Sequence, residues 1–136
     1  MAALATVTVM LVAALAALGG AGAQCPTPAS LRPSDGSVVC AQLYSDNSAY
    51  YDQCCAGDVL LVSPDDDVPY MPLNWINRVS SLVVATKCKL TVWSLPGKLG
   101  KSRTFSAVAV PRLQEYSKGL LGNWNDAISG YYCKCS

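Results

Sequence analysis

Seven cysteines constrain this chain more than any other feature, because all of them follow an apolar and uncharged N-terminal segment. They are Cys25, Cys40, Cys54, Cys55, Cys88, Cys133 and Cys135. In a small domain exported into an oxidising compartment, such a set predicts a disulfide framework in which each bridge contributes ~2–5 kcal/mol. The pairing stays open. The odd number leaves one thiol that is free, exchanging, or bonded to another copy of the chain.

The segment before the cysteines, residues 1–23, is predicted to be a signal peptide. Residues 4–18 are Ala, Val, Leu and Met interrupted only by two threonines. Ala21-Gly22-Ala23 then supplies the small-residue pattern that signal peptidase cleaves, so we expect the mature chain to begin at Gln24. The alternative is a retained membrane anchor, but an apolar run of about 15 residues is shorter than the roughly 20 that cross the hydrocarbon core.

The mature chain, residues 24–136, is long enough for one domain and contains an internal repeat. Residues 74–81 realign onto residues 123–130 after a shift of 49 positions. The shift superimposes Trp75 on Trp124, Leu43-Tyr44 on Val92-Trp93, Val59 on Val108 and Leu61 on Val110. We therefore predict that the domain is built from two equivalent halves, about 39–85 and 88–136.

Both halves carry the signals of β-strands. Residues 89–94 and 104–110 have the β-branched and aromatic content of strands, and the Pro96-Gly97 pair predicts a tight turn between them. Residues 57–63 are expected to form the matching strand of the first half. Helical periodicity is limited to one predicted turn near residues 114–118.

Two halves of short strands, each opening with an aromatic hairpin and ending in Asn/Asp-x-x-Ser, resemble the Greek-key motifs of β/γ-crystallins. In that family the hairpin carries two aromatic residues and a glycine whose positive φ folds it over the sheet. Trp93, Lys98 and Gly100 keep these places, with a lysine instead of the second aromatic. The first half keeps Tyr44, and we expect no glycine at the corresponding place. The predicted fold is all-β, a disulfide-stapled sandwich of two Greek-key motifs.

The side chains that most catalytic sites use are scarce in this sequence. It has no histidine, and Glu115 is its only glutamate. Asp65-Asp66-Asp67 is a contiguous run in which like charges repel, so it is not a convergent acid–base pair. We therefore predict that the protein is not an enzyme. Without histidine, the cysteine spacings also favour oxidation over zinc binding.

Two segments carry the oxygen ligands that calcium prefers. β/γ-crystallins bind calcium with an Asn/Asp-Asn/Asp-x-x-Ser/Thr-Ser segment. Residues 125–129 fit until Gly130 replaces the final serine, and residues 77–81 fit except that Ile76 replaces the first acid or amide. The resemblance therefore implies a weak calcium site, and the alternative is that the serines only lock loops to strands. The candidate ligands are Asn125, Asp126 and Ser129, with Asn77 and Ser80.

Charge is divided along the chain, although the net charge is only +1. Residues 24–86 hold seven aspartates and two arginines, whereas residues 87–118 hold seven cations and one glutamate. The division fits two solvated faces, or a bipolar molecule that stacks head to tail or lays its basic half on anionic headgroups. A net charge near zero argues against nucleic acid. The predicted membrane contacts are Lys98, Lys101 and Arg103, beside the apolar loop residues Leu95, Leu99, Leu120 and Leu121.

A closer resemblance covers the mature chain and all seven cysteines in their order. The matching segments are Ser34-Asp35-Gly36, residues 40–44, Tyr50-Tyr51 before Cys54-Cys55, residues 90–94, residues 111–116 and residues 127–135. They resemble the syncollin family. The resemblance implies a homo-oligomeric protein of secretory granules, notably zymogen granules, that associates peripherally with the lumenal side of the granule membrane. Its contact there is with lipids or a lumenal membrane protein, and it influences fusion during exocytosis, with pore-like action on bilayers.

A second interpretation is a secreted crystallin-like protease inhibitor or antimicrobial protein. An inhibitor needs an exposed, rigid reactive loop, and residues 62–72 are the only candidate segment. Neither interpretation requires a cofactor other than weakly bound calcium.

Overall fold

The computed structural model describes residues 25–31, 38–46, 55–120 and 122–136. The predicted signal peptide and Cys54 lie outside the described residues. Among the residues that are described, no helix has the length and apolar character needed to span a membrane. The described residues form eight strands, β1 to β8, and two single-turn 3-10 helices, η1 at Pro28–Ser30 and η2 at Leu113–Glu115. The second of these helices overlaps the turn predicted near residues 114–118.

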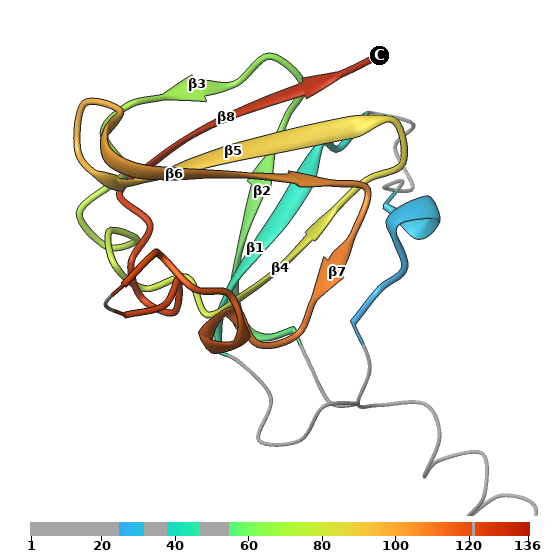
Figure 1. Ribbon diagram of the computed structural model, residues 1–136. Helices are drawn as coiled ribbons and strands as arrows, with labels where there is room; N and C mark the ends of the chain where they lie inside the picture. The colour runs from blue at the N-terminus through green and yellow to red at the C-terminus, as the bar shows by residue number, and fades with distance from the viewer. Residues whose placement is uncertain (1–24, 32–37, 47–54, 121) are drawn as a thin grey trace, which may run out of the picture.

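The strands form two four-stranded antiparallel sheets that pack against each other (Figure 1). The first sheet has the order β2 (Ala56–Val62), β1 (Ala41–Asp46), β4 (Ser81–Val84) and β7 (Ala109–Val110). The second has the order β3 (Asp67–Val68), β8 (Gly130–Cys135), β5 (Cys88–Leu95) and β6 (Leu99–Ser106). The first half places β1, β2 and β4 in the first sheet and β3 in the second. The second half places β5, β6 and β8 in the second sheet and β7 in the first. This exchange confirms the predicted two-sheet, crystallin-like sandwich.

The core lies between the sheets because the strands alternate apolar and polar side chains. In β5, Cys88, Leu90 and Val92 are buried while Lys89 is exposed. The four residues of β4 are all buried. Fully burying an aliphatic side chain stabilises the fold by about 1.5–3 kcal/mol. The largest fully buried side chains are Trp124, Leu43, Leu82, Leu90, Leu113 and Ile128.

The strand registers confirm the repeat for the first and last strands of each half. Tyr44 of β1 lies opposite Ser81 of β4, and Trp93 of β5 lies opposite Gly130 of β8. Both members of the second pair are 49 positions beyond their counterparts in the first. The two repeated tryptophans are also buried, at 7% and 1% exposure. The shift found in the sequence is therefore a real equivalence at these strands.

The same shift is wrong for the second strand of each half. Tyr44 pairs with Val59, and its counterpart Trp93 pairs with Ser102. Val59 therefore corresponds to Ser102 and not to Val108. The cause is the connection inside each hairpin, which is residues 47–55 in the first half and only residues 96–98 in the second. Six extra residues change the shift from 49 to 43.

The predicted strand over residues 104–110 is also wrong, because the chain changes sheets within it. β6 ends at Ser106, and β7 begins at Ala109 in the other sheet. Between them Ala107 has a φ of 43°, which ends the extended conformation. β-branched and apolar residues favour extension on both sides, but only tertiary pairing decides that they belong to different sheets.

The prediction that the first hairpin has no glycine at the corresponding place is wrong. The hairpin is six residues longer, so its glycine lies at a different offset from the one expected. Gly57 and Gly100 follow the 43-residue shift and have φ values of 85° and 77°. In each half a serine, Ser45 or Ser94, accepts a 2.8 Å hydrogen bond from the backbone N–H of the residue after the glycine. A Cβ would lie 2.3 Å from the Ser45 Oγ at Gly57 and 2.5 Å from the Ser94 Oγ at Gly100. Both halves therefore have the hairpin glycine.

Three disulfide bonds confirm the predicted framework. They are Cys25–Cys55, Cys40–Cys133 and Cys88–Cys135. The second connects the residue before β1 to β8 and thereby joins the two sheets, and the third joins directly opposed residues of β5 and β8. These bridges use six of the seven cysteines. The seventh is Cys54, which lies outside the described residues.

Candidate functional site

The two Asn/Asp-x-x-Ser segments meet and bind each other. The Ser80 hydroxyl donates a 2.8 Å hydrogen bond to Asp126 Oδ1, and the Ser129 hydroxyl donates one of 3.2 Å to Asn77 Oδ1. The two bonds are equivalent under the 49-residue shift. Both serines are buried. The structure therefore brings together four of the five predicted calcium ligands, while the fifth, Asn125, donates its backbone N–H to Asn123 Oδ1.

Backbone bonds repeat this symmetry. The Asn77 N–H donates to the Ile128 carbonyl at 3.1 Å, and the Asp126 N–H donates to the Val79 carbonyl at 3.0 Å. Asn77 and Asp126 have φ values of 57° and 53°, a region that Asn and Asp tolerate better than most residues. Asn77 and Asp126 therefore each meet three requirements: a left-handed backbone, a backbone hydrogen bond to the other half, and a side-chain oxygen that accepts from a serine hydroxyl. We name these paired segments the interlock.

The oxygen set of the interlock is poor for calcium. Ca²⁺ takes six to eight oxygen ligands, usually with several carboxylates. Among the predicted ligands only Asp126 carries a carboxylate, and both serine hydroxyls already donate to the side-chain oxygens that an ion would use. These contacts fit a lock between the halves better than a metal centre. Weak calcium binding stays a prediction.

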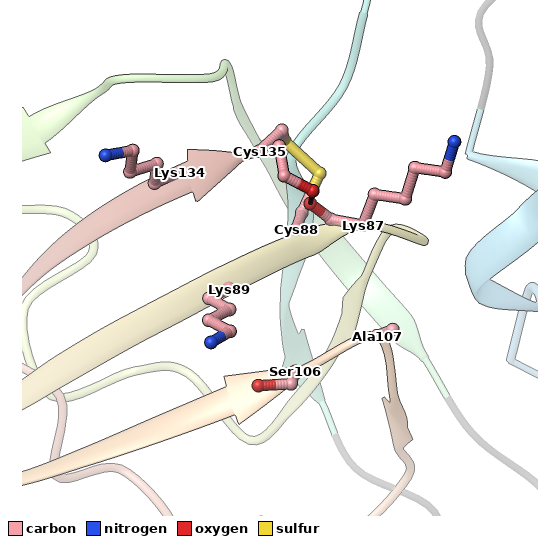
Figure 2. A pocket seen from close by; sticks show the side chains of 8 residues that line it. Lys87, Cys88, Lys89, Ser106, Ala107, Lys134 and Cys135 are labelled. Carbon is pink, nitrogen blue, oxygen red and sulfur yellow. Dashed lines mark hydrogen bonds between the residues drawn. A yellow bond between two sulfur atoms is a disulfide. The ribbon is translucent and has the colours of Figure 1, made fainter.

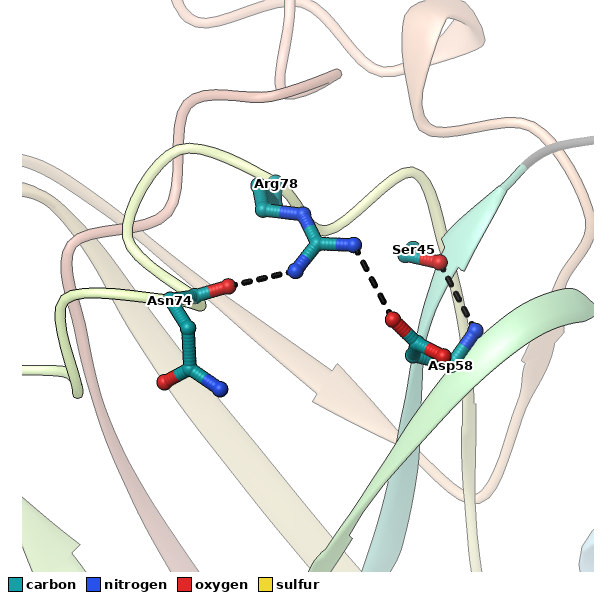
Figure 3. Close-up of polar contacts among 4 residues, drawn as sticks. All are labelled: Ser45, Asp58, Asn74 and Arg78. Carbon is teal, nitrogen blue, oxygen red and sulfur yellow. Dashed lines mark hydrogen bonds and ion pairs between the residues drawn. The ribbon is translucent and has the colours of Figure 1, made fainter.

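Arg78, which lies within the first interlock segment, brings a cation that lowers its suitability for calcium further; Figure 3 shows the polar contacts of its guanidinium. Arg78 follows Asn77 in the chain, and its Nη1 donates to the Asn74 carbonyl at 2.6 Å. Its Nη2 lies 3.2 Å from Asp58 Oδ2, and its Cζ lies 5.5 Å from the centroid of the Trp75 ring. The ion pair joins β2 to the turn before β4. A divalent ion bound nearby would be repelled by this cation.

Among the predicted membrane-binding cations, Lys98 already has structural partners. Its Nζ lies 2.5 Å from Asp67 Oδ1, and 5.4 and 5.5 Å from the ring centroids of Trp93 and Tyr132. The lysine thus takes the place of the second hairpin aromatic by setting a cation over the tryptophan ring. It connects the β5–β6 hairpin to β3. A side chain with these contacts is a weaker candidate for lipid binding than a free cation.

The other two predicted cations project from the edge strand β6. Lys101 and Arg103 are exposed, and the Arg103 guanidinium lies 4.8 Å from the centroid of the Tyr116 ring. They lie two residues apart on a strand and therefore share a face. Leu120, a predicted apolar loop contact, is fully exposed. Leu121 lies outside the described residues.

The β5–β6 hairpin ends in exposed apolar side chains. Leu95 and Leu99 lie directly opposite each other and are 53% and 62% exposed. In the turn between them, the Gly97 N–H donates to the Pro69 carbonyl at 2.9 Å. This contact brings the hairpin beside Tyr70, whose side chain is also exposed. We name Leu95, Leu99 and Tyr70 the apolar tip. Sequence reasoning missed Tyr70, because only the fold brings its loop to the hairpin.

The segment predicted as an inhibitor's reactive loop is instead part of the sandwich. Its residues Asp67–Val68 form β3 and pair with β8. The Asp65 N–H donates to the Cys133 carbonyl, and the Cys133 N–H donates to the Asp66 carbonyl. Met71 is buried. These contacts make the segment rigid, while side chains such as that of Tyr70 stay exposed. The inhibitor interpretation therefore stays a prediction.

Within the described part of the chain, one group of metal-binding side chains comes together, and it consists of cysteines. The Sγ atoms of Cys40, Cys88 and Cys135 lie within 4.8 Å of one another. All three sulfurs are in disulfide bonds, whereas zinc is bound by the thiolate. The cluster is therefore two neighbouring disulfides.

Comparisons with known proteins agree with this architecture. Among solved structures, one from work on the evolution of the eye-lens βγ-crystallin domain has a TM-score of 0.57 at 19% identity, over 77% of this chain and 91% of that chain. A βγ-crystallin from an archaeon has a TM-score of 0.53 at 12% identity, over 71% of this chain and 98% of that chain. At these identities the likeness concerns the fold alone.

Sequence relatives are much closer. Syncollin from Rattus norvegicus is 56% identical over 126 residues, which are 93% of this chain and 94% of the relative. Syncollin from Homo sapiens is 50% identical over 127 residues, 93% of this chain and 95% of the relative. The model of the syncollin family matches residues 24–135. The chain therefore belongs to the syncollin family, and its domain has a βγ-crystallin-like fold.

Proposed function

We propose that this chain is a non-enzymatic secretory-granule protein that associates peripherally with the lumenal side of the granule membrane and regulates granule fusion during exocytosis. Its family membership supports the granule setting, as the resemblance to syncollin implies. The observation that carries the membrane contact is the apolar tip. Leu95, Leu99 and Tyr70 stand exposed at the end of a hairpin that also carries Lys101 and Arg103.

The energies of such a contact are modest. Fully burying a leucine side chain contributes about 1.5–3 kcal/mol, and a tyrosine suits the membrane interface because its ring is apolar and its hydroxyl is polar. A cation near an anionic surface adds about 1 kcal/mol and loses it with salt. The tip is already partly buried, so one copy gains only a few kcal/mol. Attachment by one copy is therefore weak and reversible.

Assembly of several copies would strengthen it, because linked contacts raise the effective concentration of each. One edge of the sandwich suits homo-oligomer formation. β6 is an outer strand of its sheet, and seven of its eight residues are exposed. An unpaired strand edge is a template for another chain. A ring of copies with inserted tips also offers a route to the pore-like action that the resemblance implies.

The test is sedimentation of the purified protein with anionic vesicles. Leu95→Ser with Leu99→Ser should lower the bound fraction strongly at all salt concentrations. The matched control is Val59→Ser with Leu61→Ser, which removes two apolar side chains of similar exposure from β2. Lys101→Ser with Arg103→Ser should weaken binding at low salt only. If the tip variant sediments as the parent does, attachment runs through a protein or carbohydrate partner and the proposed tip contact is wrong.

A further inference from the structure

Three lysines surround a hollow of ≈ 410 Å³ at the end of the second sheet that lies away from the apolar tip. Lys87, Lys89 and Lys134 line it together with Ser106 and the Cys88–Cys135 disulfide. Figure 2 shows the three lysine side chains extending in different directions from the backbone around this disulfide. Lys134 comes from the last strand, far from the other two in the sequence.

The strand register places two of these lysines directly opposite each other. Lys89 lies directly opposite Lys134 on one side and opposite Ser106 on the other. Residues directly opposed in an antiparallel pair have Cβ atoms about 4.5–5.5 Å apart on one face, and like charges in such a pair destabilise the sheet. The pair therefore costs stability unless an anion lies against it.

No acidic side chain of the described residues lies against these lysines. None of the side chains lining the hollow is acidic, and the one carboxylate there is the α-carboxylate of Ser136, the last residue of the sequence. The ion pairs of the described residues are Arg78–Asp58, Lys98–Asp67 and Arg112–Glu115, none of which includes a lysine of the hollow. The hollow therefore combines an excess of positive charge, three ammonium groups against one carboxylate, with a neighbouring hydroxyl donor, which is the chemistry that recognises a tetrahedral oxyanion.

We propose that this hollow binds a phosphate group, with Lys89 and Lys134 as its principal ligands and Lys87 and Ser106 as further contacts. Its volume accommodates a phosphate with part of the molecule that carries it. The bound anion would relieve the repulsion between the opposed lysines. The phosphate could come from a free phosphate compound or from the phosphomonoester headgroup of a lipid.

The position of the hollow makes it separable from the proposed membrane contact. Lys89 is near the start of β5 and Leu95 is its last residue. At about 3.4 Å per residue, these two residues, six positions apart along the strand, are separated by about 20 Å. A bilayer that takes up the apolar tip end-on would leave the hollow facing away. The phosphate site therefore does not depend on the proposed tip contact.

The experiment titrates inorganic phosphate into the full mature protein at low ionic strength and follows its backbone amide resonances. The amides of Ser106, Ala107 and Ser136 should shift with one saturable affinity. Lys89→Ser with Lys134→Ser should weaken that affinity by about tenfold or more. Lys101→Ser with Arg103→Ser, the control, removes the same charge from β6 and should change it less than about twofold.

Thermal unfolding supplies a second measurement. Without phosphate, Lys89→Ser with Lys134→Ser should unfold at a higher temperature than the parent, because the opposed like charges are gone. Phosphate should raise the unfolding temperature of the parent and raise that of the variant much less at the same concentration. Equal phosphate effects on the parent and this variant, or amide shifts that do not saturate, would overturn the proposal.

A vesicle arm then identifies the source of the phosphate. Phosphatidylcholine vesicles are compared with vesicles that also contain a phosphoinositide phosphomonoester. Binding that needs the phosphoinositide and is lost in Lys89→Ser with Lys134→Ser assigns the site to a lipid headgroup. Phosphate binding in solution without such vesicle dependence assigns it to a soluble phosphate compound. Loss of vesicle binding in the apolar-tip variant, with phosphate titration unchanged, separates the two contacts.

Discussion

Replacing Gly57 with alanine tests the reassigned hairpin most sharply. Its φ of 85° costs an L-residue about 1–2 kcal/mol. The new Cβ would also lie 2.3 Å from Ser45 Oγ and 2.7 Å from Asp46 Cγ, so Ser45 must turn away. Ser45 then loses the hydrogen bond from the Asp58 N–H, worth about 0.5–1.5 kcal/mol. We expect Gly57→Ala to lower the free energy of unfolding by about 2–3 kcal/mol.

Gly122→Ala is the matched control, because Gly122 has the same φ of 85° while its new Cβ would meet nothing closer than Lys118 Cε at 3.4 Å. It should cost only the backbone part, about 1–2 kcal/mol. Urea unfolding of the oxidised protein, followed by tryptophan fluorescence, measures both values. In a Ser45→Ala background the cost of Gly57→Ala should fall by about 1 kcal/mol, since the overlapping hydroxyl is gone. Equal costs at the two glycines, or no change in that background, would refute the reasoning.

Three further predictions concern the bridge between the sheets, the buried phenols and calcium. Cys40→Ala with Cys133→Ala opens a bridge between residues 93 positions apart and should lower the free energy of unfolding in urea by about 4 kcal/mol. Burial raises the pKa of Tyr44 and Tyr131, so the stability that their protonated phenols contribute is complete below a pH of about 10 and is lost as the pH rises further. The urea midpoint of the parent should therefore fall above that pH, and that of Tyr131→Phe should fall less. Calorimetry with millimolar Ca²⁺ should give weak heat that disappears in Asp126→Asn, and no heat in the parent would leave the interlock as a purely structural device.

Much of the fold could be predicted because it depends on local or repeated patterns. Alternating residues identify β5, and the 49-residue shift identifies the equivalence of β1 with β5 and of β4 with β8. Both signals survive because these strands are central in their sheets, where burial on the core face demands apolar residues at fixed positions. The two serines of the interlock were found for the same reason, since they sit immediately before the last strand of each half.

The candidate sites were harder to predict, because they combine residues that the sequence separates. In the sequence, residues 87–118 form one basic stretch. In the structure, Lys98 forms an ion pair with Asp67, and Lys89 lies opposite Lys134, which is outside that stretch. Tyr70 joins the apolar tip only because the hairpin turn binds the Pro69 carbonyl. No spacing rule in a single sequence signals these contacts.

The sequence by itself determined that this chain is a small, duplicated, disulfide-bonded β domain. Cysteine number, apolar alternation and the repeated Asn/Asp-x-x-Ser segments are properties of residues and their local order. Only the tertiary structure decided the disulfide pairs, the place of Gly57 and the exchange of β3 and β7 between the sheets. The physical reason is that strand register and sheet membership are set by contacts across strands, and an insertion of six residues in one hairpin moves those contacts without altering any local pattern.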